Sequence, residues 1–101
     1  MPNFVKAAKV SEMRPNEGKL FELDGRSFAL FLVEGKYYCV DNTCLHRGGP
    51  ICEGFLDGAV VACPWHGWQY DLDTGQCKGR PSAKLATYEV RVEGDDILIG
   101  T

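Results

Sequence analysis

The chain has 101 residues, of which 45% are hydrophobic and 25% charged, as expected for a globular protein with one modest core. The 11 Lys and Arg residues against 14 Asp and Glu residues give a formal net charge of -3, which argues against a nucleic-acid-binding surface. This length predicts a single domain spanning residues 1–101.

The N-terminal segment lacks the pattern of a secretion signal, because residues 1–6 contain no charged start followed by a long apolar run. No apolar run approaches the roughly 18 residues of a membrane helix. We therefore expect a cytoplasmic protein that binds no membrane. The five cysteines are an odd number, and a reducing compartment favours metal ligation over a disulfide framework. The mild acidity is compatible with a basic partner without requiring one.

The first half of the chain predicts four strands separated by turns. A polar loop over residues 11–18 follows the first strand. Asp24-Gly25 lies between two apolar runs and predicts a type I′ turn, whose two central residues both need φ > 0. Glu34-Gly35 joins the next pair. The predicted strands are residues 4–10, 19–23, 26–33 and 36–40.

The second half predicts shorter strands with glycine turns. Asp57-Gly58 separates residues 55–56 from 59–62 in a predicted hairpin. Residues 68–71, 85–92 and 97–99 are the remaining predicted strands, with turns at 73–75 and 94–96 and an irregular stretch over 78–84. No stretch shows a sustained 3.6-residue period, so the sequence indicates an all-β sandwich or small barrel.

Two Cys-His pairs are the most informative feature. Cys44-Leu45-His46 is followed after sixteen residues by Cys63-Pro64-Trp65-His66, and these are the only two histidines of the chain. Thiolate and imidazole are the usual soft metal ligands of proteins. The spacing therefore predicts that Cys44, His46, Cys63 and His66 bind a metal centre.

Three interpretations of the pairs are open at this point. The cysteines are small buried hydrophobes, or the four residues hold a structural zinc ion, or they hold an iron–sulfur cluster. Zinc sites usually keep like ligands together, whereas each pair here has one Cys and one His. The mixed pairs favour a two-iron cluster, with Cys44 and Cys63 on one iron and His46 and His66 on the other.

The double motif resembles the Rieske 2Fe–2S signature. The likeness continues through Gly48-Gly49-Pro50 after the first pair and through residues 67–71 and 73–75 after the second. The resemblance implies an all-β, Rieske-like β-sandwich with a small cluster-binding subdomain of two loops, over about residues 42–70. It also implies that Cys44, His46, Cys63 and His66 bind a Rieske-type 2Fe-2S cluster.

Departures from the family pattern indicate a low-potential subtype. High-potential members tie the loops together with a disulfide, but Gly49 and Trp65 stand at those two positions. A serine that bonds a cluster sulfide in those members is Trp68 here, while Tyr70 matches a tyrosine whose hydroxyl bonds a cysteine sulfur. Fewer hydrogen bonds to sulfur lower the reduction potential.

The resemblance implies an electron carrier without catalytic activity of its own, and the sequence shows no nucleophile–base constellation. We expect a monomer that takes one electron from a flavin-dependent ferredoxin reductase. The expected acceptor is a terminal oxygenase, either an aromatic ring-hydroxylating dioxygenase or a multicomponent monooxygenase. The alternatives are the small subunit of an assimilatory nitrite reductase and a structural Cys2His2 zinc module for protein contacts.

Several other residues have a structural interpretation as well as a functional one. Cys39 lies in a predicted strand and is expected in the core. Cys52 and Cys77 are expected to be free thiols in a reducing compartment. Trp65 shields the cluster, contacts a partner or simply packs, and Arg47 is either a docking charge or a solvated one.

Overall fold

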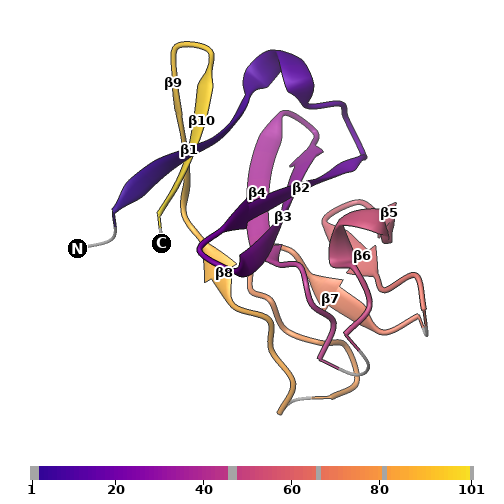
Figure 1. Cartoon of the computed structure of the whole chain (residues 1–101). Coiled ribbons are helices and arrows are strands. Elements are labelled where there is room, and N and C mark those ends of the chain that lie inside the picture. Colours follow the sequence, from indigo (N-terminus) through magenta and orange to yellow (C-terminus); the bar gives the residue numbers. More distant parts are fainter. Residues whose placement is uncertain (1–2, 46–47, 66, 81, 101) are drawn as a thin grey trace.

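A computed structural model describes residues 3–45, 48–65, 67–80 and 82–100 (Figure 1). Within these ranges the chain forms ten strands and two 3₁₀ turns, which confirms the all-β prediction. The strands are β1 (Phe4–Lys9), β2 (Gly18–Leu23), β3 (Arg26–Val33), β4 (Lys36–Asp41), β5 (Phe55–Asp57), β6 (Val60–Ala62), β7 (Gln69–Asp71), β8 (Thr87–Tyr88), β9 (Val90–Glu93) and β10 (Asp96–Gly100). The turns are η1 (Val10–Glu12) and η2 (Ile51–Glu53), and no described helix has the length or apolar character to cross a membrane.

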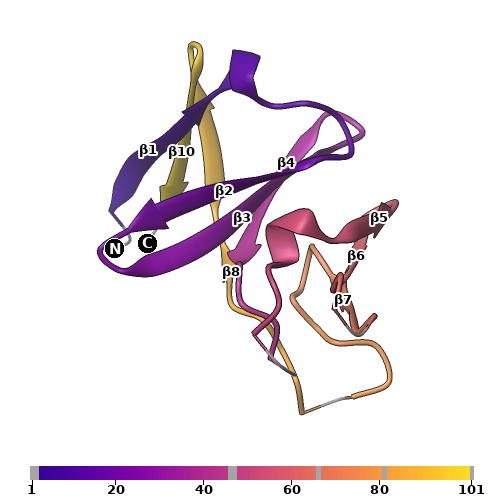
Figure 2. The same cartoon turned by 45° about the vertical axis from the view of Figure 1, so that its right-hand side comes forward.

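The strands form three antiparallel sheets. β1, β10 and β9 form the first, β2, β3, β4 and β8 form the central sheet, and β5, β6 and β7 form a small sheet. The small sheet lies away from the β9–β10 hairpin, on the other side of the central sheet (Figures 1 and 2). The connections that follow β4, β6 and β7 contact one another: Gly49 lies against Cys63, and Lys78 bonds to Gln69 at the start of β7.

Strand β3 supplies side chains to two separate cores. Successive strand residues point to opposite faces, and both faces of β3 are covered, so four consecutive residues from Phe28 to Phe31 are fully buried. The body core consists of Ala8, Met13, Phe28, Leu30, Cys39, Ile97 and Ile99. The tip core consists of Ala29, Phe31, Val33, Val40, Cys44, Ile51, Val61, Cys63, Tyr70, Leu72, Cys77 and Leu85.

The predicted Asp24-Gly25 turn is confirmed. Asp24 has φ 51° and Gly25 has φ 79°, the two positive values that a type I′ turn needs. Leu23 pairs directly with Arg26 across this turn. The same geometry recurs at Glu34 (φ 50°) and Gly35 (φ 80°), so two successive tight turns fix the register of β2, β3 and β4.

The prediction of one strand over residues 85–92 is wrong. The segment is divided into β8, which pairs with β4, and β9, which pairs with β10. The chain changes sheets at Glu89, whose carbonyl accepts the Gly100 N–H at 2.9 Å. The alternating pattern of the sequence is satisfied by two short strands in different sheets as well as by one long strand.

The predicted turn at Asp57-Gly58 is displaced by one residue. Asp57 pairs with Val60, so Gly58 and Ala59 form the two-residue loop between β5 and β6. Gly58 has φ 59°. A two-residue hairpin with glycine at its first central position is a known alternative to the Asp-Gly type, and the pairing of Phe55 with Ala62 selects it.

Candidate metal centre

The first Cys-His loop is closed by two backbone hydrogen bonds. Cys44 donates its N–H to the Gly49 carbonyl at 2.9 Å, and Gly48 donates its N–H to the Cys44 carbonyl at 2.9 Å. Gly48 has φ 74°, a conformation that glycine adopts without strain. The bonds place Cys44 at the base of a tight six-residue loop.

The second loop repeats this pattern position by position. Cys63 donates its N–H to the Trp68 carbonyl at 2.8 Å, and Gly67 donates its N–H to the Cys63 carbonyl at 3.0 Å. Gly67 has φ 76°, matching the fifth residue of the first loop. Two loops of the same backbone geometry therefore each carry a cysteine at the first position and, in sequence, a histidine two or three residues later.

The two loops contact each other at Gly49. A Cβ atom on residue 49 would lie 2.6 Å from the Cys63 Sγ and 3.1 Å from the Trp65 ring, so only glycine fits. The Trp65 ring occupies the space beside Gly49 and is 57% exposed. Position 49 is thus closed to any side chain larger than that of glycine.

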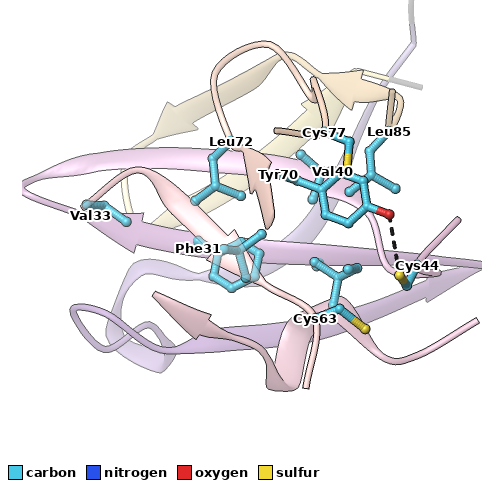
Figure 3. Close-up of a cluster of buried hydrophobic side chains, with 12 residues drawn as sticks. Phe31, Val33, Val40, Cys44, Cys63, Tyr70, Leu72, Cys77 and Leu85 are labelled. Carbon is cyan, nitrogen blue, oxygen red and sulfur yellow. Dashed lines mark hydrogen bonds between the residues drawn. The ribbon is translucent and has the colours of Figure 1, made fainter. Parts of the chain in front are cut away.

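Tyr70 fixes the sulfur of the first loop from inside the core. Its hydroxyl lies 3.3 Å from the Cys44 Sγ (Figure 3). The same hydroxyl accepts the Leu45 N–H at 3.2 Å. Because the hydroxyl oxygen accepts that N–H, its own proton is available to the sulfur. Burial, and then the bond to Cys44, raise the pKa of Tyr70 well above its ordinary value, so the phenol stays neutral and can donate. The predicted Tyr70–cysteine contact is confirmed.

The predicted ligands fall into two groups in the structure. Cys44 and Cys63 are 3% and 2% exposed, belong to the tip core and have their sulfurs at one edge of it (Figure 3). His46 and His66 lie outside the described residues, and among those described no group of three His, Cys, Asp or Glu side chains is arranged to hold a metal ion.

The donor set fits an iron–sulfur cluster. Two buried cysteine sulfurs come from adjoining loops of matched geometry, and one of them already has a neutral phenol directed at it. The glycine contact at residue 49 keeps the space beside the Cys63 sulfur free of a bulky side chain. Thiolates from two loops, backed by hydrogen-bond donors, are the protein environment that such clusters use.

A third segment, within residues 77–86, supports the loops, although its sequence predicted only an irregular stretch over 78–84. Lys78 donates its N–H to the Gln69 carbonyl at 2.8 Å, directly after the second loop. The Arg80 guanidinium lies 3.9 Å from the centre of the Trp68 ring. The Gln76 amide donates to the Arg80 and Ala83 carbonyls at 3.1 and 3.0 Å and holds the segment in place.

The remaining cysteines behave as predicted. Cys39 is 2% exposed in the body core, which confirms its structural role. Cys52 and Cys77 are free thiols, one half-buried and one buried. All five cysteines are described, and none forms a disulfide.

Comparison with known proteins gives consistent matches. The family model described as Rieske [2Fe-2S] domain matches residues 3–89. The biphenyl dioxygenase ferredoxin subunit of Pseudomonas sp. (strain KKS102) is 35% identical over 98 residues, which cover 95% of this chain and 90% of that protein.

Solved structures show the same fold. A chain of a structure described as a complex of reduced oxygenase and oxidized ferredoxin in carbazole 1,9a-dioxygenase is 27% identical, with a TM-score of 0.88 over 96% of this chain and 92% of that one. A nitrite reductase small subunit from Mycobacterium tuberculosis, described as NADH-dependent, is 23% identical with a TM-score of 0.92, over 100% and 96% of the two chains. At that identity the second likeness shows the fold alone.

Proposed function

This chain belongs to the Rieske [2Fe-2S] domain family, and from that premise we propose that it is the ferredoxin component of a multicomponent oxygenase system. The proposal rests mainly on the two loops of matched geometry, which bring Cys44 and Cys63 to one edge of the tip core. The cofactor of the family is a Rieske-type 2Fe-2S cluster. As in its ferredoxin relatives, the chain carries electrons and catalyses no reaction alone.

Cys44, His46, Cys63 and His66 are the proposed ligands. When bound, the cluster supplies a centre that gains and loses one electron at a time. The chain provides buried sulfur positions, a neutral Tyr70 hydroxyl beside Cys44, and loop backbones fixed by hydrogen bonds. This rigidity keeps the ligands in one arrangement in both redox states, which favours fast electron transfer.

The proposed donor is a flavin-dependent ferredoxin reductase, and the proposed acceptor is the terminal oxygenase of a ring-hydroxylating dioxygenase or multicomponent monooxygenase. The similarity to a ferredoxin solved together with its oxygenase supports the acceptor. We place the exchange in the cytoplasm, where thiolate ligands stay reduced. The carrier acts as a monomer, since one cluster per chain suffices for one-electron shuttling.

Metal and spectroscopic analysis tests the ligand assignment. We expect about two iron and two acid-labile sulfide per chain, a red-brown colour and a rhombic EPR signal after reduction. His46→Ala and His66→Ala should each remove most of the cluster, whereas Cys52→Ala, which changes a half-buried cysteine outside the loops, should retain it. A colourless protein with one zinc ion would refute the cluster and revive the zinc module.

Reconstitution tests the partners. Reduced protein should be oxidised by a ring-hydroxylating terminal oxygenase in the presence of its aromatic substrate, and a flavin-dependent reductase should reduce it again. The nitrite reductase alternative rests on shared fold alone. Oxidation by a nitrite reductase large subunit, with none by the oxygenase, would decide for that alternative.

A further inference from the structure

The charges of this chain are unevenly distributed along the sequence. Segments 42–52, 62–69 and 77–86, which contain the two Cys-His loops and the supporting third segment, include four of the 11 basic residues and none of the 14 acidic residues. The rest of the chain therefore has seven basic and fourteen acidic residues, a formal charge of -7. The net charge of -3 is therefore the sum of +4 in these three segments, the cationic end, and -7 in the rest of the chain, the acidic body.

Two of the described cationic residues of this end, Lys78 and Arg80, are held beside the second loop. The Arg80 guanidinium stacks on Trp68, and the Lys78 backbone is bonded to Gln69. Lys84 forms an isolated antiparallel β-bridge with Gln76. The side chains of Lys78, Arg80 and Lys84 are exposed. Figures 1 and 2 both show this segment beside the first loop at the end of the molecule away from the β9–β10 hairpin.

Several carboxylates that flank these segments in sequence are directed elsewhere, among them Asp73, whose Oδ1 lies 3.6 Å from the Lys36 Nζ. Asp41 accepts the Tyr88 hydroxyl at 2.7 Å, and Asp71 accepts the Asp73 N–H at 2.9 Å. Glu53 lines a cavity of about 380 Å³ with Asn16 and other residues on the β2 side. None of these contacts places a carboxylate against Lys78, Arg80 or Lys84.

Two exposed apolar side chains accompany the cations. Leu45 is 52% exposed on the first loop, and Trp65 is 57% exposed where its ring contacts Gly49 of the other loop. Exposed aromatic side chains and arginine are both enriched in protein interfaces. We define the tip face as the exposed side chains Leu45, Trp65, Lys78, Arg80 and Lys84.

We propose that the tip face docks on an acidic, partly apolar face of the redox protein that exchanges electrons with this chain, an inference that rests on the proposed function. An acidic partner attracts the cationic end and repels the body of charge -7, so the molecule approaches with its cluster loops foremost. Leu45 and Trp65 then supply the short-range apolar contact. Nucleic acid is disfavoured as the occupant, because its dense phosphates would repel the acidic body.

Gold electrodes coated with carboxylate-terminated thiols provide a defined acidic probe, and amine-terminated thiols provide its opposite. We expect the protein to adsorb on the carboxylate layer at 10 mM salt despite its negative net charge, as measured with a quartz-crystal microbalance. Raising the salt to 300 mM should release it, because the Debye length then falls to well below 10 Å. Voltammetry on the carboxylate layer should show electron transfer at least about tenfold faster than on the amine layer, where the body binds instead.

The triple variant Lys78→Gln, Arg80→Gln, Lys84→Gln should lose at least about tenfold of both the adsorption and the electron-transfer rate on carboxylates. The matched control changes three exposed cations of the β1–η1 end, Lys6→Gln, Lys9→Gln and Arg14→Gln, with the same loss of charge. The control should adsorb on the carboxylate layer like the unmodified protein. Equal losses in the two variants would overturn the tip face, because net charge alone would then explain the adsorption.

Failure of this inference is distinct from failure of the proposed function. A normal cluster signal with equal or faster electron transfer on the amine layer refutes the acidic partner and leaves the carrier function intact. No redox signal on either layer, from protein without iron, refutes the carrier function, while adsorption still reports the charge of the tip. Tighter binding to duplex DNA or to vesicles of anionic lipid than to the carboxylate layer would assign the tip face to those occupants and overturn the proposal.

Discussion

Single residues set the environment of the two cysteine sulfurs. Tyr70 is fully buried, accepts the Leu45 N–H and lies within hydrogen-bond distance of the Cys44 sulfur, so one side chain connects the tip core, a loop backbone and a proposed ligand. Gly49 acts by what it lacks, since a methyl group there would overlap the Cys63 sulfur. The residue types at these two positions follow from contacts between segments that are distant in sequence.

Tyr70→Phe should lower the midpoint potential while leaving the cluster bound. The change removes the hydroxyl that faces the Cys44 sulfur and returns electron density to that sulfur. Loss of a hydrogen bond of about 1 kcal/mol corresponds to a decrease in midpoint potential on the order of tens of millivolts. Redox titration followed by EPR measures it. Tyr88→Phe, which removes a hydroxyl bonded to Asp41 and Arg26 rather than to a cysteine, should not shift the potential. An unchanged or higher value for Tyr70→Phe would contradict the assigned role.

The Cys39 thiol should make the fold sensitive to high pH. Burial, with a further contribution from the Asp41 charge, raises the pKa of Cys39 from 9.0 to about 12. A raised pKa in the folded state means that the full stability is present below pH 9 and is lost as the pH rises through about 12. Between pH 8 and pH 10.5 the lost contribution is about 2 kcal/mol.

Urea unfolding of the protein and of Cys39→Ala at both pH values isolates this contribution. The variant should be less stable at pH 8 because of its smaller side chain. The difference in unfolding free energy between the protein and the variant should be about 2 kcal/mol smaller at pH 10.5. A difference in unfolding free energy that stays constant between the two pH values would contradict this prediction, because the Cys39 thiol should ionise in this range only in the unfolded state.

Whole elements determine where the loops lie. β3 contributes Leu30 to the body core and Phe31 to the tip core, so the central sheet is the common wall of both. The two Cys-His loops then repeat one backbone arrangement, each with a glycine of positive φ at its fifth position. A single geometry used twice presents two cysteines toward a shared space.

Gly49→Ala should disturb this pairing of loops more than it disturbs the fold. The added Cβ would approach the Cys63 sulfur to 2.6 Å, so the loops must separate. We expect a loss of at least half of the bound iron per chain, with the far-ultraviolet circular dichroism unchanged. Gly79→Ala is the control: its φ of 76° strains alanine, but its Cβ would meet no atom within 4 Å, so it tests backbone strain at the same end of the molecule without a collision. Full iron content in Gly49→Ala would contradict the close contact of the loops.

The whole molecule combines two cores with an uneven charge distribution. The body core joins the first sheet to the central sheet, and the tip core joins the central sheet to the small sheet and the third segment. The cationic tip face lies at the end that holds the proposed ligands, whereas the acidic excess is carried by the rest of the chain. Stability and electron exchange are therefore supported by different parts of one small protein.

Removal of iron with a chelator under reducing conditions should loosen the tip and spare the body. Cys44 and Cys63 belong to the tip core, and metal binding is coupled to folding where the ligands also form the core. Hydrogen exchange should accelerate by at least about tenfold at the Cys44 and Cys63 amides, while the amides of Ile97 and Ile99 in β10 stay protected. Uniform loss of protection along the chain would show that the two cores unfold together.

The amino-acid sequence was sufficient to predict the spacing of the proposed ligands, the all-β class and the tight turns. Asp24-Gly25 predicts its own conformation because few residues adopt φ > 0, and two Cys-His pairs have few interpretations other than a metal centre. Local chemistry suffices for such features. The ligand role of Cys44, His46, Cys63 and His66 stays a prediction, supported by the family and the loop geometry.

Contacts between distant segments could be found only in the folded chain. Residues 85–92 are divided between two sheets because β8 pairs with β4 and β9 pairs with β10. The alternation of apolar and polar residues predicts a strand but not the strand with which it pairs. The stacking of Arg80 on Trp68 and the contact of Gly49 with the Cys63 sulfur likewise join residues more than ten positions apart. Such contacts depend on how the sheets pack in space, which is why the cationic tip was hidden behind a net charge of -3 until the fold placed its residues together.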